Sequence, residues 1–513
     1  MTGGLLVAGT QSEAGKSLVA AGICRWLHRR GVRVAPFKAQ NMALNSAVTP
    51  GGAEIGRAQV VQAAAAGVPA EAAMNPVLIK PSGERHSQVV LMGRPHADAC
   101  ARSYQEMKHR LREPVLAAFE DLRSRFDVVI CEGAGSPAEI NLRAGDLANM
   151  GLARAADLPV VVVGDIDRGG VFASFLGTLA LLEPADQALV AGFLVNKFRG
   201  DPGILAPGLE QIRTLTGRPV LGTLPFREDL GLDAEDSLAL DKPRPEPVAP
   251  VDGGDTLEVA VLRLRWTSNF TDVDPLSAEP GVSVRFTRSP ADVERADLVL
   301  VPGTKATVED LERLRASGLA TALERRARAG QPILGVCGGY QMLGGRIEDR
   351  VESGRGEVRG LGLLPVATEF ATDKLVRQVA GTFIGPGADG VPACGYEIRH
   401  GRPIRRGGTA LVDDGSDSGE GCADGPVIGT SWHGLLEGDE VRRGLLGWVA
   451  DRRGRSWTPG SEAFATVRER HLDRLGDLIE EHADTDALLA LIERGAPPDL
   501  PMIAPGGALC SSS

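Results

Sequence analysis

A loop near the start of the chain restricts the fold more than any other feature of the sequence. Gly9–Ser17 reads Gly-Thr-Gln-Ser-Glu-Ala-Gly-Lys-Ser and lies between an apolar run, Leu5–Ala8, and a segment with helical periodicity, Leu18–Arg30. A glycine-rich loop that joins a strand to a helix binds phosphate groups, because its backbone N–H groups and the helix N-terminus point at the anion. We therefore expect an α/β domain with a nucleotide at this loop.

Apolar runs alternate with longer helical patterns over the first 240 residues. The expected later strands are Val32–Phe37, Asp127–Cys131, Pro159–Gly164, Leu189–Asn196 and Pro219–Gly222. Strands that alternate with helices form mostly parallel sheets with helices on both faces. The fold class expected for this half is an α/β P-loop domain with a parallel sheet.

A proline-rich segment interrupts this pattern and marks a domain boundary. Asp241–Pro250 contains four prolines, and Gly253 and Gly254 lie just beyond it. Such a stretch is typical of a semi-extended linker. A second α/β pattern then begins at Leu257–Leu264. We expect four parts: residues 1–240, a linker at 241–254, a second α/β domain at 255–450, and a C-terminal extension at 451–513 with a disordered tail. Asp413–Gly425 is rich in Gly, Asp and Ser and is expected to be a flexible surface loop.

Charge and cysteine content exclude several classes of protein. The net charge of −11 argues against nucleic acid or an anionic membrane as the main partner. No apolar run approaches the ~18 residues that cross a bilayer. The seven cysteines contain no Cys-x-x-Cys pair, which disfavours a disulfide scaffold and a zinc ribbon. We expect a cytoplasmic protein with small-molecule substrates, and the sequence leaves a homo-oligomer open.

Polar residues at the carboxyl ends of the expected strands complete the nucleotide site. In open α/β sheets ligands bind at this edge. Lys16 is positioned to neutralise terminal phosphates, and the Ser17 hydroxyl is positioned to reach Mg²⁺. Carboxylate oxygens suit the same ion. The expected nucleotide-binding residues are Thr10, Gly15, Lys16, Ser17, Lys38 and Asn196, and the expected Mg²⁺ ligands are Ser17, Glu132 and Asp165.

A cysteine directly after an apolar strand indicates a second reactive site. Ile333–Val336 is followed by Cys337, Gly338 and Gly339, which is typical of a strained strand-to-helix turn that projects a nucleophile. An unperturbed thiol has a pKa of ~8.5 and is only slightly ionised at neutral pH, so the cysteine needs a base. His433, in a Gly-flanked loop, is the expected base. The backbone N–H groups of Val301–Lys305 and Gly338 are expected to form an oxyanion hole.

The motifs of both halves of the chain resemble those of known families. The C-terminal half resembles a class I glutamine amidotransferase, through Cys337–Gln341 and Thr430–Gly434, and the N-terminal half resembles a dethiobiotin synthetase-type ATPase. Their fusion in this order is similar to the cobyric acid synthases and the cobyrinic acid a,c-diamide synthases, and the first family is favoured. Four stretches carry that similarity: Pro36–Met42, Glu132–Glu139, Ser268–Asp272 and Pro302–Lys305.

The resemblance implies an activity that composition and spacing do not show. It implies ATP- and glutamine-dependent amidation of the b, d, e and g carboxylates of an adenosylated cobyrinic acid a,c-diamide, in cobalamin biosynthesis. It implies ATP and Mg²⁺ but no tightly bound prosthetic group, and an enclosed path for ammonia. It gives Cys337 as the nucleophile and His433 as its base. The glutamine and oxyanion residues would be Gly303, Gly338, Tyr340 and Gln341.

The sequence departs from the family pattern in three places. Leu264–Thr267 replaces the usual Leu-Pro type of pair before Ser268. Arg399 separates His400 from Ile398, where the family places a histidine directly. Leu435 stands where many relatives place a Glu two residues after the catalytic histidine. The third member of a triad is therefore left open, with Glu437 as one candidate to orient His433.

Three other functions share parts of the pattern. A cobyrinic acid a,c-diamide synthase would perform the same chemistry on carboxylates a and c, but it carries a different sequence after the second strand. A CTP synthase has the same domain order, but its nucleotide substrate should need a different set of binding residues in the N-terminal domain. A non-catalytic P-loop switch would not need both Cys337 and His433.

Overall fold

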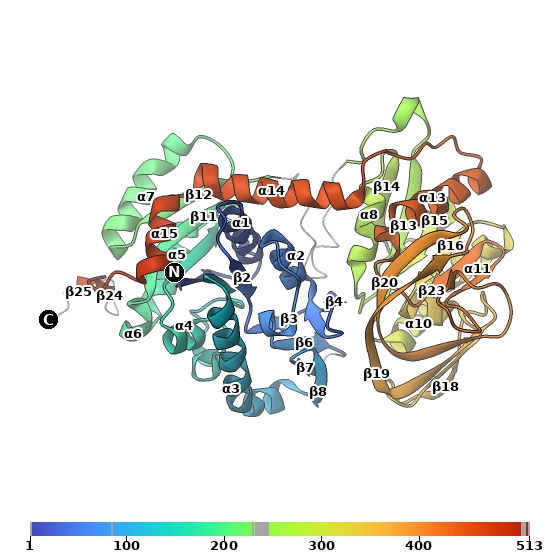
Figure 1. Cartoon of the computed structure of the whole chain (residues 1–513), viewed down its shortest axis with the longest axis horizontal. Helices are drawn as coiled ribbons and strands as arrows, with labels where there is room; N and C mark the ends of the chain where they lie inside the picture. The colour runs from blue at the N-terminus through green and yellow to red at the C-terminus, as the bar shows by residue number, and fades with distance from the viewer. Residues whose placement is uncertain (1–2, 84–85, 228–229, 231–245, 504–508, 511–513) are drawn as a thin grey trace.

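The computed structural model describes residues 3–83, 86–227, 230, 246–503 and 509–510. The chain forms two α/β lobes that one long helix, α14 (Phe464–His482), connects (Figure 1). Part of the expected linker, residues 241–245, lies outside the described residues. No helix in the described ranges is long and apolar enough to cross a lipid bilayer.

The first lobe is built on a six-stranded parallel sheet with the order β12-β11-β10-β1-β9-β2. The strands are β1 (Gly3–Gly9), β2 (Val34–Phe37), β9 (Val128–Glu132), β10 (Val160–Asp165), β11 (Val190–Phe198) and β12 (Val220–Pro225). Their apolar runs are continuous because helices cover both faces of the sheet. Along β1, Leu5 and Val7 enter one core cluster, whereas Leu6 and Ala8 enter the other.

Helices of the first lobe divide between these two faces. The face of Leu5 packs against α1, α14 and α15, and the face of Leu6 packs against α3, α4, α5 and α7. The bounds are α1 (Lys16–Arg29), α2 (Arg57–Ala65), α3 (Ala101–Arg125), α4 (Met150–Ala156), α5 (Val171–Ala180), α6 (Pro184–Gln187), α7 (Pro202–Thr216) and α15 (Thr485–Arg494).

A set of short strands follows β2, and the sequence patterns did not predict it. The four-stranded sheet has the order β3-β6-β7-β8, and a separate hairpin pairs β4 with β5. The strands are β3 (Gln40–Met42), β4 (Ser46–Val48), β5 (Glu54–Gly56), β6 (Val77–Pro81), β7 (Ser87–Leu91) and β8 (Arg94–Ala99). β4 lies against the long strands of the second lobe. This segment therefore forms the side of the first lobe that faces its neighbour.

The second lobe contains a six-stranded sheet and a smaller sheet beside it. The larger has the order β14-β13-β15-β16-β23-β22, in which only the β22–β23 pair is antiparallel, and the smaller contains β17, β18, β19, β20 and β21. The strands are β13 (Leu257–Leu262), β14 (Val282–Thr287), β15 (Leu298–Val301), β16 (Ile333–Val336), β17 (Arg346–Asp349), β18 (Gly356–Arg359), β19 (Val366–Phe383), β20 (Val391–Arg405), β21 (Val412–Asp413), β22 (Cys422–Asp424) and β23 (Val427–Thr430). The helices are α8 (Asp274–Ser277), α9 (Pro290–Arg295), α10 (Thr307–Ala316), α11 (Leu319–Arg328), α12 (Gly338–Leu343) and α13 (Asp439–Arg453), and two short turns are η5 (Phe270–Val273) and η6 (Leu435–Glu437).

The surface loop is shorter than the expected Asp413–Gly425, because only its first part, residues 413–419, is mostly exposed. β21 and β22 occupy its two ends, and Glu420 between them is buried. The Glu420 carboxylate accepts hydrogen bonds from the Thr430 hydroxyl at 2.8 Å and from the Ser431 backbone N–H at 2.6 Å. These bonds tie the polar segment to the core strand β23, which a reading of local composition cannot detect.

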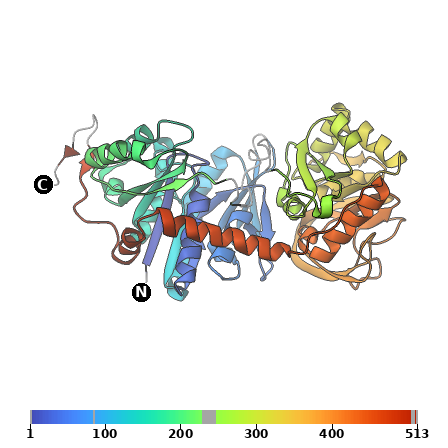
Figure 2. The same ribbon diagram turned by 90° about the horizontal axis from the view of Figure 1, so that it is seen from above.

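The C-terminal extension returns to the first lobe along α14 (Figure 2). Leu475 and Ile479 of α14 are fully buried against α1. Arg25 of α1 pairs with Asp473 at 2.9 Å, and Arg29 pairs with Asp477 at 2.5 Å. The extension is therefore a folded part of the first lobe.

The disordered tail expected beyond Pro497 is wrong for its first part. β24 (Met502–Ile503) pairs with β25 (Leu509–Cys510), and the Ile503 N–H donates to the buried Gln187 side chain at 2.8 Å. The remaining tail positions 504–508 and 511–513 lie outside the described residues.

Truncation of Leu475 to alanine is expected to destabilise the first lobe. The side chain has no exposure to solvent, so its loss leaves a cavity between α14 and α1, at a cost of about 2–5 kcal/mol. Urea unfolding followed by circular dichroism measures this change. The half-exposed neighbour Asp473 provides the control, because Asp473→Asn removes only a surface pair worth about 0–1 kcal/mol. Equal midpoints for Leu475→Ala and the wild type would show that α14 does not contribute to the core.

Candidate active site

The phosphate loop has a backbone shape that requires glycine. Gly15, at the N-terminus of α1, has φ 102°, and a Cβ there would approach the Asn196 Nδ2 to 2.0 Å. The same Asn196 amide donates to the Ala14 carbonyl at 2.9 Å. The Thr10 N–H donates to the Val163 carbonyl at 2.9 Å, which fixes the start of the loop to β10. Asn196 thus supports the loop from the end of β11.

Lys16 and Ser17 lie where the loop enters α1. The Lys16 ammonium donates to the carbonyls of Gln11 and Gly135 at 2.9 and 3.0 Å, so it lies across the mouth of the loop. The Ser17 hydroxyl donates to the Glu132 Oε1 at 2.7 Å. The structure thus brings together three of the residues that the sequence assigned to nucleotide and metal.

Glu132 is the centre of a buried polar group. It is 1% exposed, and it also accepts from the Lys38 ammonium at 2.9 Å and from the Gln62 amide at 2.5 Å. Hydroxyl and carboxylate oxygens are the ligands that Mg²⁺ prefers, so Ser17 and Glu132 fit that ion.

Asp165, the third expected Mg²⁺ ligand, has different partners. It lies at the end of β10 and pairs with the Lys197 ammonium at 2.6 Å. It also accepts from the Asp167 N–H at 3.0 Å. Over the described residues, no group of three or more His, Cys, Asp or Glu side chains could hold a metal. Ser17 and Glu132 are therefore the two residues best suited to hold Mg²⁺.

Cys337 occupies a strained turn between β16 and α12. Its φ is 51° and its ψ is −109°, a conformation that costs a non-glycine residue of order 1–3 kcal/mol. Two backbone bonds hold it: the Cys337 N–H donates to the Thr430 carbonyl at 2.8 Å, and its carbonyl accepts from the Gln341 N–H at 3.0 Å. This geometry is that of a nucleophile elbow.

The two glycines after Cys337 allow a close approach of two loops. A Cβ on Gly338 would lie 2.7 Å from the Thr304 methyl group, and one on Gly339 would lie 1.9 Å from the Val301 carbonyl oxygen. A Cβ on Gly303 would lie 3.0 Å from the His433 Cε1. The backbone at Gly303 and Gly338 therefore lies beside the elbow, where oxyanion donors are needed.

His433 is held by a carboxylate at one nitrogen of its ring. Its Nδ1 lies 2.7 Å from the Asp272 Oδ2, and the second oxygen of Asp272 accepts from the Gly434 N–H at 2.8 Å. The Cys337 side chain lies close enough to the imidazole to raise its pKa. Cys337, His433 and Asp272 thus have the mutual contacts of a catalytic triad.

The electrostatics of this group favour a charged imidazole. Burial acts to lower the pKa of His433, but the Asp272 carboxylate and Cys337 outweigh burial and raise the pKa to about 10. An imidazolium beside the sulfur stabilises a thiolate, which is the nucleophilic form of cysteine.

Other residues singled out in the sequence have different positions. Glu437 does not orient His433: its carboxylate pairs with Arg57 at 2.8 Å and with Arg468 at 2.9 Å. The Tyr340 side chain is 2% exposed and packs beneath Gly429 in the core, where burial raises its pKa. Gln341 lies on the wall of the cavity that contains Cys337.

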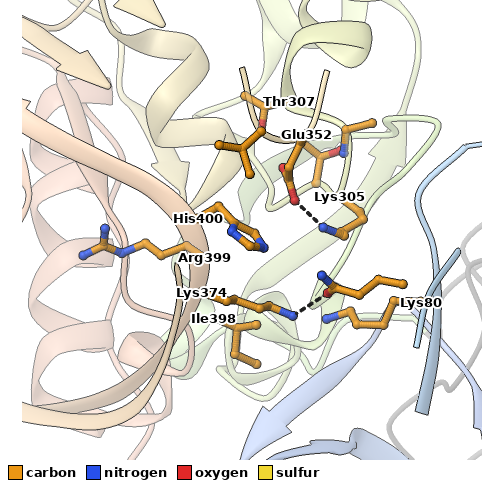
Figure 3. Close-up of polar contacts among 12 residues, drawn as sticks. Lys80, Lys305, Thr307, Glu352, Lys374, Ile398, Arg399 and His400 are labelled. Atoms are coloured by element: carbon orange, nitrogen blue, oxygen red, sulfur yellow. Dashed lines mark hydrogen bonds and ion pairs between the residues drawn. The ribbon is translucent and has the colours of Figure 1, made fainter. Parts of the chain in front are cut away.

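The cavity beside Cys337 is lined by both lobes. Lys80, on β6, comes from the first lobe, whereas Lys305, Glu352, Lys374 and His400 come from the second (Figure 3). The His400 Nδ1–H donates to the Ala371 carbonyl at 3.1 Å, and burial lowers the pKa of the ring. Arg399, which separates His400 from Ile398, also lines the cavity.

Sequence reasoning missed two sets of functional candidates. Asp272 is the last residue of Ser268–Asp272, a stretch that carries the family resemblance, but nothing in the sequence indicates that it contacts His433. Lys80, Lys374 and Glu54 lie far apart in sequence and carry no local motif, so only the folded chain brings them together.

Two family descriptions match the chain. Residues 5–239 match the CobQ/CobB/MinD/ParA nucleotide binding domain, and residues 258–441 match the CobB/CobQ-like glutamine amidotransferase domain. The two matched regions correspond to the two lobes. The first contains the phosphate loop, and the second contains Cys337 and His433.

Curated relatives match over the full length. Cobyric acid synthase of Frankia casuarinae is 58% identical over 99% of this chain and 100% of its own. The Streptomyces coelicolor cobyric acid synthase is 58% identical over 99% of each chain. The Mycobacterium bovis cobyric acid synthase is 55% identical over 98% of this chain and 99% of its own.

Proposed function

The chain belongs to the cobyric acid synthase family, and on that premise we propose that it amidates the b, d, e and g carboxylates of adenosylcobyrinic acid a,c-diamide. It is a glutamine-dependent amidotransferase of cobalamin biosynthesis with a nucleotide-binding domain. The observation that carries the proposal is a phosphate loop with Ser17 and Glu132 on one lobe and a Cys337–His433–Asp272 group on the other. We place the reaction in the cytoplasm, where ATP and glutamine are available together.

The second lobe would release ammonia from glutamine. The Cys337 sulfur attacks the side-chain amide carbon, and His433 delivers a proton to the departing ammonia. Asp272 holds the imidazole through Nδ1 and stabilises its charged form. The N–H groups near Gly303 and Gly338 would donate to the oxyanion of the tetrahedral intermediate. Water then hydrolyses the glutamyl thioester and regenerates the thiol.

The first lobe would activate the corrin carboxylate. A free carboxylate is a poor electrophile, so transfer of the terminal phosphoryl group of ATP gives an acyl phosphate that ammonia can attack. Lys16 and Lys38 would balance the negative charge of the transferring group. Ser17 and Glu132 would hold Mg²⁺, whose positive charge would offset the negative charge of the phosphates. Displacement of phosphate by ammonia then forms the amide.

Product analysis by mass spectrometry tests this assignment. Purified protein is incubated under anaerobic conditions with adenosylcobyrinic acid a,c-diamide, ATP, Mg²⁺ and glutamine. Each conversion of a carboxylic acid to an amide changes the mass by a fixed increment, and we expect the series to stop after four steps. Adenosylcobyrinic acid, with carboxylates a and c free, is the comparison substrate. An unchanged a,c-diamide together with rapid glutamine hydrolysis would show that the corrin assignment is wrong.

A further inference from the structure

The cavity at Cys337 contains more positive than negative charge at its interlobe end. Three lysine side chains, Lys80, Lys305 and Lys374, meet two carboxylates, Glu54 and Glu352. Lys305 pairs with Glu352, and in Figure 3 His400 lies between this pair and Lys374. Burial lowers the pKa of His400, which favours the neutral ring, so the histidine adds no further positive charge. A buried surplus of one ammonium is costly unless an anion approaches it.

Glu54 holds two of these lysines side by side. It is fully buried on β5, and its two oxygens accept from Lys80 at 2.5 Å and from Lys374 at 2.6 Å. The pair bridges the lobes, because Lys80 lies on β6 and Lys374 lies on β19. Burial, together with the other two lysines, lowers the pKa of Lys374 to about 8 against the opposing effect of Glu54.

The hydrogen bonds leave each of the two ammonium groups with one N–H for a ligand. An ammonium has three donors. Lys80 uses two, for Glu54 and for the Ser46 hydroxyl at 2.8 Å, and Lys374 uses two, for Glu54 and for the side-chain amide oxygen of Gln88 at 2.8 Å. These are the bonds found within the described part of the chain. Two neighbouring donors of this kind match the two oxygens of a carboxylate.

Glutamine carries such a carboxylate a few bonds from the amide that Cys337 attacks. Arg399 is the other strong cation of the cavity wall, but its guanidinium bonds to Glu397 at 2.6 Å and to the Gly401 carbonyl at 2.6 Å. In Figure 3 it points away from the lysines. Lys80 and Lys374 are therefore better placed than Arg399 to receive the α-carboxylate.

We propose that Lys80 and Lys374, held together by Glu54, bind the α-carboxylate of glutamine, so that the first lobe completes the glutamine site of the second. The proposal rests on the glutaminase half of the function proposed above. Glu352, whose Oε1 already pairs with Lys305, is the carboxylate of the cavity wall that would also accept from the α-ammonium group of the same substrate. Because Lys80 and Ser46 belong to the strands at the lobe interface, glutamine would bind fully only when the two lobes are docked.

Comparison of glutamine with 4-aminobutanamide, which lacks the α-carboxylate, tests the proposal. In the full-length enzyme, Lys80→Met should raise the KM for glutamine roughly 10- to 100-fold, the effect of losing one charge-assisted hydrogen bond. The preference of kcat/KM for glutamine over 4-aminobutanamide should fall by a similar factor. Lys80→Arg, which keeps the charge, should recover part of that preference.

Lys108 is the matched control. It is also a buried lysine of the first lobe, on α3, with a pKa lowered by burial, but it does not line the cavity. Lys108→Met should leave the glutamine KM at the wild-type value. The inference is overturned if Lys80→Met lowers kcat/KM for both amides equally, or changes neither. Failure of the wild type to hydrolyse glutamine would instead overturn the function proposed above.

Discussion

Replacement of Cys337 by alanine is expected to abolish glutamine-dependent amidation while ammonia-dependent amidation continues. Without the sulfur no thioester forms, and loss of a catalytic nucleophile costs about four orders of magnitude or more in rate. The site around Lys16 and Glu132 lies on the other lobe, so acyl phosphate formation should persist. The measurement is corrin amide formation by mass, with either glutamine or ammonium chloride as nitrogen source at mildly alkaline pH.

The variant should also remain folded. Alanine has the same backbone restriction at φ 51° as cysteine, and it removes only one buried atom. Cys394 gives a matched control, because it is an exposed cysteine of the same lobe, on β20. Cys394→Ala should keep both activities. If Cys337→Ala lost amidation with ammonium as well, the division of labour between the lobes would be incorrect.

The sequence predicted those parts of the site that form from one contiguous segment. The phosphate loop, with Gly15, Lys16 and Ser17, depends on a single strand–loop–helix unit, so its residue order determines its geometry. The elbow at Cys337 depends likewise on a strand followed by two small residues. In both places the steric demand is local: a Cβ at Gly15 or Gly339 would collide with a neighbouring group.

The parts that sequence reasoning missed depend on contacts between distant segments. Asp272 approaches His433 because η5 and η6 pack together, and no spacing rule connects their sequence positions. Glu437 is likewise positioned by distant segments, because its carboxylate pairs with Arg57 of the first lobe and with Arg468 of α14. The carboxylate that orients His433 is therefore the distant Asp272 and not Glu437, which is close to His433 in sequence.

Residues of both lobes surround His433, because the site lies at the interface between the lobes. The Tyr396 ring stacks on His433 with centroids 5.4 Å apart, and the Tyr396 hydroxyl donates to the Ser46 carbonyl at 3.1 Å. The Ser46 N–H donates to the Asn269 side chain at 3.1 Å. The β4–β5 hairpin thus contacts the residues around His433 directly. A change in lobe docking would therefore disturb the base as well as the lysine pair.

Substitution of Asp272 by asparagine is expected to lower glutamine hydrolysis by about 10³–10⁴-fold in kcat, the scale seen when a triad carboxylate is replaced. The side chain keeps its volume, so the fold should persist. An asparagine amide that donates to Nδ1 would place the imidazole proton on the nitrogen facing Cys337, and the ring would then no longer accept the thiol proton. If added ammonium restored amidation but glutamine hydrolysis stayed low, the defect would lie at His433.

The pH dependence separates this role from simple loss of stability. In the wild type, Asp272 and Cys337 outweigh burial and raise the pKa of His433 to about 10, so the imidazolium persists through neutral pH and is lost as the pH rises through that value. Without the Asp272 carboxylate, less charge offsets the effect of burial, so the pKa of His433 falls. The alkaline limb of the kcat/KM profile should therefore move to lower pH in Asp272→Asn. Asp274→Asn, at the first position of α8, should keep the wild-type profile, with a rate within about twofold. An unmoved limb in Asp272→Asn would mean that Asp272 does not control the protonation of His433.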